Sequence, residues 1–94
     1  MKVKVPVKTV EMRWNRFGNL YILVDPRTNR TYTLDMIAFL VWIQCDGKTT
    51  VEEMTDVFSV DGNRDIVEAA IRGILHKLEK AGLIKWIEVK KKPS

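Results

Sequence analysis

The sequence has few residues of the kinds that build disulfides, metal centres and active sites. Its 94 residues include one cysteine and one histidine, which excludes an internal disulfide and the common metal sites made of several cysteines or histidines. Its five glycines are scattered along the chain and do not form a loop that could cradle a phosphate. We therefore expect no catalytic centre, no cofactor and no metal ion.

Long apolar runs and targeting signals are also missing. The longest apolar run, residues 36–43, is far shorter than the ~20 residues that a membrane helix needs. Residues 1–8 mix lysine with valine and lack the continuous apolar core of a signal peptide. A hydrophobic content of 46% and a charged content of 30% are ordinary for a folded domain. These features predict a single soluble, cytoplasmic domain over residues 1–94, with no membrane partner.

The net charge of +4 is unevenly distributed along the chain. Residues 1–34 carry +5, residues 35–63 carry −5 and residues 64–94 carry +4. The basic ends favour an acidic partner. Chance is the alternative explanation in a chain with 16 basic and 12 acidic residues.

Three short strands are expected in the first third of the chain. Residues 10–14 alternate between apolar and charged side chains, which is the pattern of a half-buried strand. Residues 20–24 (LYILV) and 30–34 (RTYTL) have the β-branched and aromatic content of two further strands. A turn at 15–19 and the sequence DPRTN at 25–29 separate them. The three strands predict a small antiparallel meander.

Two helices are expected in the middle of the chain. The first lies between Asp35, a good N-terminal cap, and Gly47, which offers a left-handed stop. Because it is apolar on every side, it must be covered on several sides or offer a stripe to a partner. The second begins at a capping box made by Thr50 and Glu53. Its apolar stripe consists of Val51, Met54, Val57 and Phe58.

The third helix is expected between a cap at Asn63 and a stop at Gly82, and residues 83–89 form a last strand. Its broad apolar face consists of Ile66, Val67, Ala70, Ile71, Ile74, Leu75 and Leu78. These elements predict an α+β fold like a winged helix-turn-helix, with an N-terminal three-stranded antiparallel meander, three helices and a short C-terminal strand. Residues 1–8 either pair with the last strand or fray, and residues 90–94 form a lysine-rich tail.

The few reactive residues have ordinary explanations. His76 lies on the polar side of the third helix, and Cys45 ends an apolar helix, where a small buried thiol is usual. Glu52, Glu53 and Asp56 are typical of a solvated acidic face with a cap. Binding is therefore favoured over catalysis.

Three helices followed by a strand also suggest a winged-helix DNA-binding regulator. The acidic segment 35–63 would repel phosphates, and the chain has room for only one strand of the wing. The basic third helix and Lys90–Lys92 favour DNA. This function is the main alternative, and a homodimer built on the apolar first helix is a third.

The stretch from Tyr32 to Phe58, followed by Ile66 to Ile84, resembles the PqqD-like family. The shared pattern is a short strand ending in leucine, an apolar helix with an aromatic residue near its end, an Asp-Gly pair, a Thr-Val-Glu-Glu helix start and a final helix ending in Gly-Leu-Ile. The matching residues are Leu34, Trp42, Asp46, Gly47, Thr50, Val51, Glu52, Glu53, Leu75, Leu78, Gly82, Leu83 and Ile84. Asp35 stands where the family often has asparagine, and both residues cap helices well. The resemblance covers about residues 10–87.

The resemblance implies a domain that recognises peptides during the biosynthesis of ribosomally made, modified peptides. Such a domain binds the leader of a precursor peptide and presents the peptide to a modifying enzyme, often a radical S-adenosylmethionine enzyme. The leader adds as a strand beside the third strand of the meander, over a groove floored by the third helix. The expected peptide-binding residues are Arg30, Thr31, Tyr32, Thr33, Leu34, Arg64, Val67, Ile71, Leu75 and Lys77.

Two groups among these residues have distinct expected roles. Arg30, Arg64 and Lys77 would ring the groove with positive charge, which suits an acidic leader. Val67, Ile71 and Leu75 would either floor the groove or belong to the ordinary core.

Overall fold

The structure is a computed structural model that describes residues 1–60 and 62–91. Its elements in chain order are β1 (Lys2–Lys8), β2 (Arg13–Phe17), β3 (Leu20–Val24), β4 (Thr31–Asp35), α1 (Met36–Ile43), α2 (Val51–Phe58), α3 (Arg64–Lys80) and β5 (Ile84–Lys90). The α+β class, the meander, the three helices and the C-terminal strand are confirmed. Asp61 and residues 92–94 of the expected tail lie outside the described residues.

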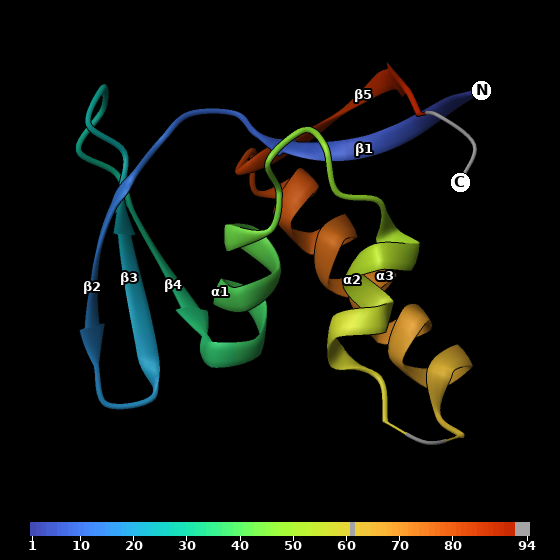
Figure 1. Ribbon diagram of the computed structural model, residues 1–94. Coiled ribbons are helices and arrows are strands. Elements are labelled where there is room, and N and C mark those ends of the chain that lie inside the picture. Colours follow the sequence, from blue (N-terminus) through green and yellow to red (C-terminus); the bar gives the residue numbers. More distant parts are fainter. Residues whose placement is uncertain (61, 92–94) are drawn as a thin grey trace.

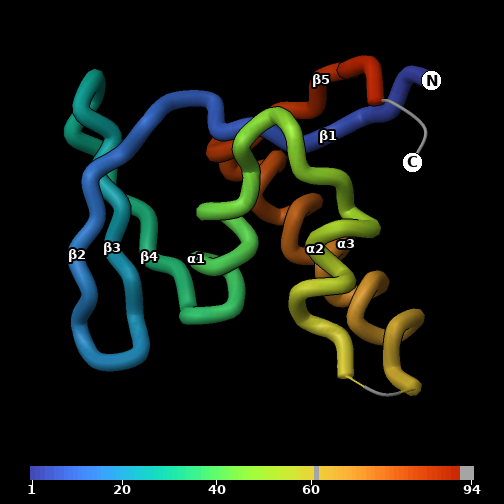
Figure 2. Tube along the Cα trace, in the orientation of Figure 1, coloured from blue at the N-terminus to red at the C-terminus, as the bar shows by residue number. Residues whose placement is uncertain are grey.

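The strands form two separate sheets (Figure 1). β1 and β5 pair antiparallel, from Lys2 opposite Lys90 to Lys8 opposite Ile84, so the N-terminal segment pairs and does not fray. The meander forms a second sheet in the order β2-β3-β4, which leaves β2 and β4 as its edges. The strand that pairs with β5 thus comes from the start of the chain and not from a hairpin after α3. The β2-β3-β4 sheet stands at one side of the molecule, with α1 between it and the pair α2 and α3 (Figure 2).

The first strand of the meander lies later in the chain than expected. It begins at Arg13 and runs to Phe17, so the expected turn over residues 15–19 was wrong. Gly18, with a φ of +61°, forms a two-residue turn with Asn19 that brings Phe17 opposite Leu20. Such a short turn with glycine first suits the twist of a hairpin, and it lets the strand continue to its edge.

Helix α1 is shorter than the stretch between Asp35 and Gly47, the two residues expected to bound it. The Asp35 carboxylate caps it by accepting from the Ala38 amide at 2.8 Å, as expected. The helix ends at Ile43 because the following residues pair with β1: the Lys8 amide donates to Cys45 at 3.1 Å, and the Gly47 amide donates to Pro6 at 3.0 Å. One side of α1 is buried through Phe39, Val41 and Trp42. Its other side is exposed through Met36, Ile37, Leu40 and Ile43.

Local signals set the ends of the other two helices. The capping box of Thr50 and Glu53 is present at the start of α2. A Schellman motif ends α3, since the Leu83 amide donates to the Leu78 carbonyl and the Gly82 amide to Glu79, both at 2.9 Å. The expected side-chain cap from Asn63 is wrong, because its Oδ1 accepts from the Val60 amide instead.

Three residues of the expected apolar faces are exposed, among them Ala70 of α3. Val57 of α2 is 68% exposed and Ile66 of α3 is 74% exposed. They flank the α2–α3 connection, at the end of the helix pair farthest from the β1–β5 ladder (Figure 1), where no described element covers them. Thr55 takes the buried place on α2, with its hydroxyl donating to the Val51 carbonyl at 2.8 Å. Over the described ranges, none of the helices has the length and apolar character needed to cross a membrane.

Candidate functional site

A cleft of about 280 Å³ lies between β4 and the C-terminal half of α3. Its walls come from β4, from the first turn of α1, and from α3 with the residue that follows its stop. The lining residues are Tyr32, Thr33, Leu34, Asp35, Ala38, Ile74, Lys77, Leu78, Ala81 and Leu83.

The backbone of β4 presents free hydrogen-bonding groups at the edge of the sheet. The Asp25 amide donates to the Arg30 carbonyl at 2.9 Å, which places this pair among the bonded positions of the β3–β4 ladder. Bonded positions alternate along an antiparallel pair, so the even-numbered residues of β4 bond to β3. The N–H and C=O groups of Thr31 and Thr33 therefore point away from β3, at an edge that no other described strand occupies.

The floor of the cleft is apolar. Tyr32 and Leu34 are half-buried and pack against the core. Ile74, also half-buried, and the buried Leu78 face them from α3. Thr31 and Thr33 lie on the opposite face of the sheet and are exposed. An extended chain along β4 would thus find backbone partners at its side and apolar side chains beneath it.

The structure brings together some of the expected site residues and separates others. Tyr32, Thr33, Leu34 and Lys77 all line the cleft, and Thr31 continues the same edge. Ile71 and Leu75 lie in the core, where they are 3% and 0% exposed, and Val67 is half-buried against the same core. Of the two roles expected for these three residues, their positions match ordinary core.

Six further residues line the cleft but were not among the expected site residues: Asp35, Ala38, Ile74, Leu78, Ala81 and Leu83. The signal for part of this set was present in the chain. Ile74, Lys77 and Ala81 follow a spacing of three and four residues, which places them on one side of a helix. Lys77 was already expected in the groove, so its helical neighbours on that side were candidates as well.

Two of the residues lining the cleft are charged, Lys77 and Asp35, and the expected site residue Arg30 is not among them. Arg30 precedes β4 and Lys77 projects from α3, and within residues 1–60 and 62–91 neither forms an ion pair. Asp35 stands at the other end of β4. Arg64 does not belong to this ring of charge, because it begins α3 more than three turns before Lys77, about 20 Å away along the helix axis.

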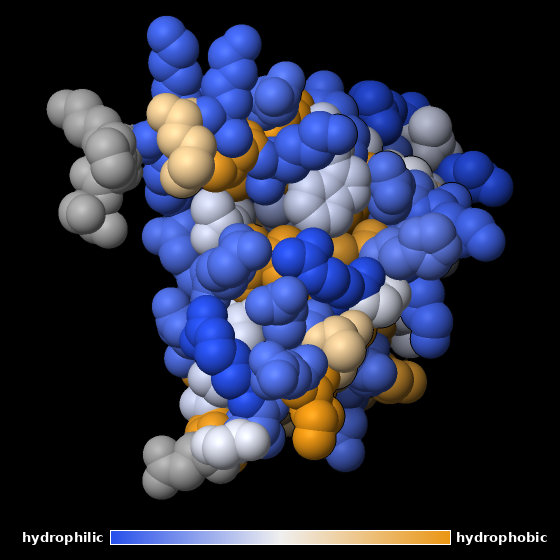
Figure 3. All heavy atoms as spheres, turned by 90° about the vertical axis from the view of Figure 1, so that its right-hand side faces the viewer, coloured by the Kyte–Doolittle hydropathy of each residue, from blue (hydrophilic) through white to orange (hydrophobic). Residues whose placement is uncertain are grey.

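The arginines of α3 face α2 and not the cleft. Arg64 donates to the Asp56 carboxylate and, at 3.2 Å, to the Glu52 carbonyl. Arg72 contacts Glu52 at 3.5 Å and Glu68 at 3.1 Å. The acidic helix and the basic helix therefore neutralise each other in part. The surface over this side of the molecule is mostly hydrophilic, with small apolar areas between the charged side chains (Figure 3).

A second hollow, of about 620 Å³, is larger than the cleft and lies on another side of α3. Val3, Lys4, Val51, Glu52, Arg72, Glu79 and Trp86 line it. Arg72 and Glu52 on its walls already pair with each other. We assign the candidate site to the smaller cleft because the cleft adjoins outward-pointing backbone groups that need a partner.

The residues most suited to catalysis do not form a site. Cys45 is buried, and this burial raises the pKa of its thiol to about 12 although the Lys8 ammonium nearby opposes the shift. His76 is exposed. In the described part of the chain, no three histidine, cysteine, aspartate or glutamate side chains are grouped so that they could hold a metal ion.

Comparison with known proteins identifies the family and the fold of this chain. The family model for Coenzyme PQQ synthesis protein D (PqqD) matches residues 21–84, a range that contains every residue lining the cleft. The fold is also that of the solved structure "TbiB1 in Complex with the TbiA(beta) Leader Peptide", with a TM-score of 0.63 and 22% sequence identity over 84% of this chain and 94% of that one. No curated protein matches the chain. This chain belongs to the PqqD family.

Proposed function

We propose that this protein binds the leader of a ribosomally made precursor peptide as an added strand on β4 and presents the peptide to a modifying enzyme. The observation that carries the proposal is the open edge of β4 beside an apolar cleft. Membership of the PqqD family supports it, and so does the likeness to TbiB1, whose structure holds a leader peptide. The protein itself performs no chemical step in this proposal.

Strand addition uses the two features of the cleft together. The outward N–H and C=O groups of Thr31 and Thr33 would pair with the peptide backbone and supply affinity. Alternate peptide side chains would enter the cleft between Leu34 and the α3 residues Ile74 and Leu78, and these contacts would select the sequence. Arg30 and Lys77 favour acidic residues in the part of the leader that lies near them.

The finer part of the proposal concerns the partner enzyme. The family resemblance favours a radical S-adenosylmethionine enzyme, and we propose that both proteins act in the cytoplasm. A second protein is required because the cleft has backbone donors and apolar side chains but none of the paired reactive groups that catalysis uses.

DNA binding is the second candidate, and the ion pairs of α3 argue against it. A winged-helix protein reads the major groove with its third helix. Here Arg64 and Arg72 are engaged by carboxylates of α2 and α3, which would also repel the phosphate backbone. Random duplex DNA at low salt should therefore bind weakly. Micromolar affinity with a steep salt dependence would favour DNA over peptide.

A titration followed by amide chemical shifts tests the peptide proposal. The probe is the synthetic leader of the precursor peptide encoded beside this protein, and a scrambled peptide of the same composition is the control. The leader should shift the amides of β4 and of residues 74–81, whereas the scrambled peptide should not. Shifts confined to α2 and the first half of α3 would contradict strand addition.

A further inference from the structure

Strand β3 has the composition of a strand that is covered on both faces. Its five residues, LYILV, are all apolar or aromatic. An antiparallel sheet with one solvated face normally alternates apolar and polar residues, while continuous apolar runs are typical of strands buried on both sides. In this structure only one face of β3 is covered, because α1 packs against it through the stacked rings of Tyr21 and Phe39, 4.0 Å apart.

The register of the sheet defines which residues lie on the uncovered face. Trp14 and Leu23 are opposite each other on the α1 side, so their neighbours along each strand point outward. The outer face consists of Arg13, Asn15 and Phe17 from β2, Leu20, Ile22 and Val24 from β3, and Thr31, Thr33 and Asp35 from β4. No other element in the described part of the chain lies over it, since this sheet forms one side of the molecule (Figure 1).

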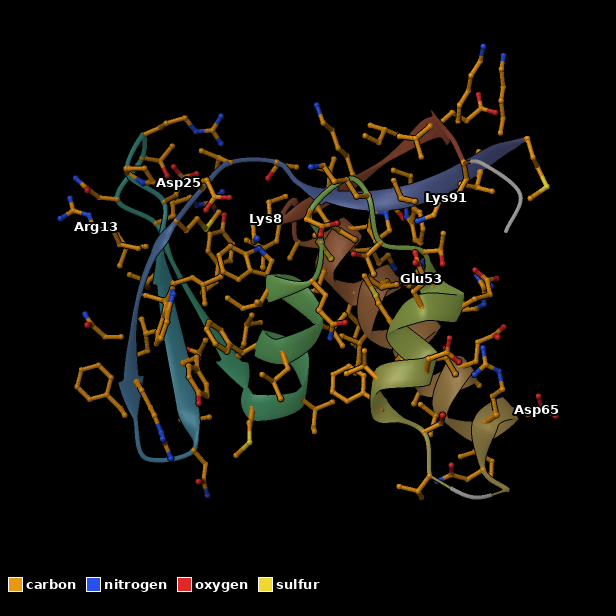
Figure 4. All side chains as sticks on the ribbon, viewed as in Figure 1. Lys8, Arg13, Asp25, Glu53, Asp65 and Lys91 are labelled. Atoms are coloured by element: carbon orange, nitrogen blue, oxygen red, sulfur yellow. The ribbon has the colours of Figure 1, made fainter. Side chains whose placement is uncertain are left out.

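The outer face has an apolar stripe along β3, extended at one corner by Phe17 of β2 and bordered by polar residues of β2 and β4. Phe17 is 62% exposed and Leu20 is 46% exposed, and Ile22 and Val24 are only half-buried. Arg13 at one corner points away from the rest of the protein (Figure 4). Asp35 lies at the diagonally opposite corner. An exposed apolar stripe bordered by polar side chains suits a protein–protein interface.

We infer that the modifying enzyme docks on this outer face, which rests on the peptide-binding function proposed above. The outer face is continuous with the edge of β4 to which the leader adds, and this supports the docking site. The Thr31 and Thr33 side chains lie on the outer face, while their backbone groups form the edge to which the leader adds. A leader strand on β4 would widen the sheet, and every second leader residue would point to the same outer face.

The residues of the outer face define the chemistry of the enzyme surface that would fit it. The enzyme surface carries an apolar centre against Leu20 and Ile22 and a carboxylate opposite Arg13. Since it also contacts outward-facing residues of the leader, the enzyme binds the complex of protein and leader more tightly than the protein alone. No conformational change is needed for this coupling.

The test uses the full chain with the double substitution Phe17→Thr and Ile22→Thr, because threonine is β-branched and suits a strand at both positions. The control is Val57→Thr with Ile66→Thr, which removes two exposed apolar side chains from the far end of the helix pair. The probe is the purified modifying enzyme encoded beside the precursor peptide, titrated calorimetrically with saturating leader. We expect the outer-face variant to bind the enzyme at least tenfold more weakly, and the control to bind as the wild type does.

Leader affinity measured without the enzyme separates this inference from the function on which it rests. The outer-face variant should bind the leader within twofold of wild type, because the edge of β4 is intact. A wild-type chain that fails to bind the leader contradicts the proposed function, whereas unchanged enzyme affinity in the outer-face variant contradicts only the docking face. The single substitution Phe17→Thr, near the strand end, replaces the double variant if the latter does not fold.

A second copy of this chain is the competing occupant of the outer face. Sedimentation equilibrium of the wild type at tens of micromolar, without enzyme, tests this. A monomer supports the inference. A dimer that the substitution at Phe17 converts to a monomer overturns it, because the face would then be covered by the protein itself.

Discussion

Proline substitutions in β4 provide a strict test of how its backbone is oriented. Thr33→Pro removes an N–H that points to solvent, so the free protein loses no internal hydrogen bond, and proline is tolerated at such edge positions. Tyr32→Pro removes an N–H that bonds to β3. That loss leaves a carbonyl of β3 unpaired, which costs about 1–3 kcal/mol in addition to the bond itself.

The two variants should differ clearly in thermal stability. For a domain of this size, 1 kcal/mol corresponds to about 4–8 °C in Tm. We expect Thr33→Pro to lower Tm by less than about 5 °C and Tyr32→Pro by more than about 10 °C. Tyr32→Thr controls for the lost ring. If Thr33→Pro unfolds the protein while Tyr32→Pro is tolerated, the assignment of outward groups is wrong.

Thr33→Pro should also weaken the binding of the leader. Thr33→Pro takes away one donor and leaves a peptide carbonyl unpaired, a cost of about 1–3 kcal/mol. Because 1.4 kcal/mol is tenfold in affinity, Kd should rise by roughly 5- to 100-fold. Thr33→Val keeps the N–H and should bind as the wild type does in calorimetry. Equal Kd values for the proline and valine variants would refute strand addition at this position.

Three further predictions concern stability and reactivity. Hydrogen bonds from the Arg27 side chain and amide hold the pKa of Asp25 below its usual range. The ionised Asp25 carboxylate therefore stabilises the folded protein above about pH 4, and this stabilisation is lost as pH falls through the folded pKa. In thermal melts, Asp25→Asn should lower Tm more at pH 7 than at pH 3. The buried Cys45 thiol, with its pKa raised to about 12, should react with a disulfide reagent at pH 8 at least about a hundredfold more slowly in the native than in the denatured protein. Gly73 is exposed in the middle of α3, where an added Cβ meets nothing within 4 Å, so Gly73→Ala should raise the free energy of unfolding by about 0.5–1 kcal/mol in urea titrations.

The parts of the fold that the sequence predicted well depend on neighbouring residues. The bounds of β3, the Asp35 cap, the Thr50–Glu53 capping box and the glycine stop after α3 each follow from signals within a few positions. The pairing of β1 with β5 joins opposite ends of the chain, and no local pattern could decide between pairing and fraying. The shift of β2 was missed because Gly18 and Asn19 alone form a turn for which five residues were expected.

The candidate site was predicted at the level of elements but not of all side chains. The edge strand and the helix that the family resemblance and the strand pattern indicate both line a cleft in the structure, and its role in binding peptide stays a prediction. Which part of a broad apolar helix face meets the core depends on how neighbouring helices pack. Ile71 and Leu75 were therefore not distinguishable from Ile74 and Leu78 before the structure, and the pairing of Arg64 with Asp56 depends on the same packing.

Helix α3 provides a rigid wall for the cleft that we propose binds the leader. One of its sides is fixed in the core by Ile71 and Leu75, and another is held to α2 by Arg64 and Arg72, so the side that carries Lys77 has little freedom to move. A rigid wall facing an edge strand needs little reordering on binding, which leaves the entropy cost mainly to the peptide. The leader would use the edge of β4 and the inner face of the sheet, and the enzyme would use the outer face. These surfaces share Thr33 and Asp35 at the edge of β4 and otherwise differ, so both partners can be bound at once, and the strand added by the first enlarges the surface offered to the second.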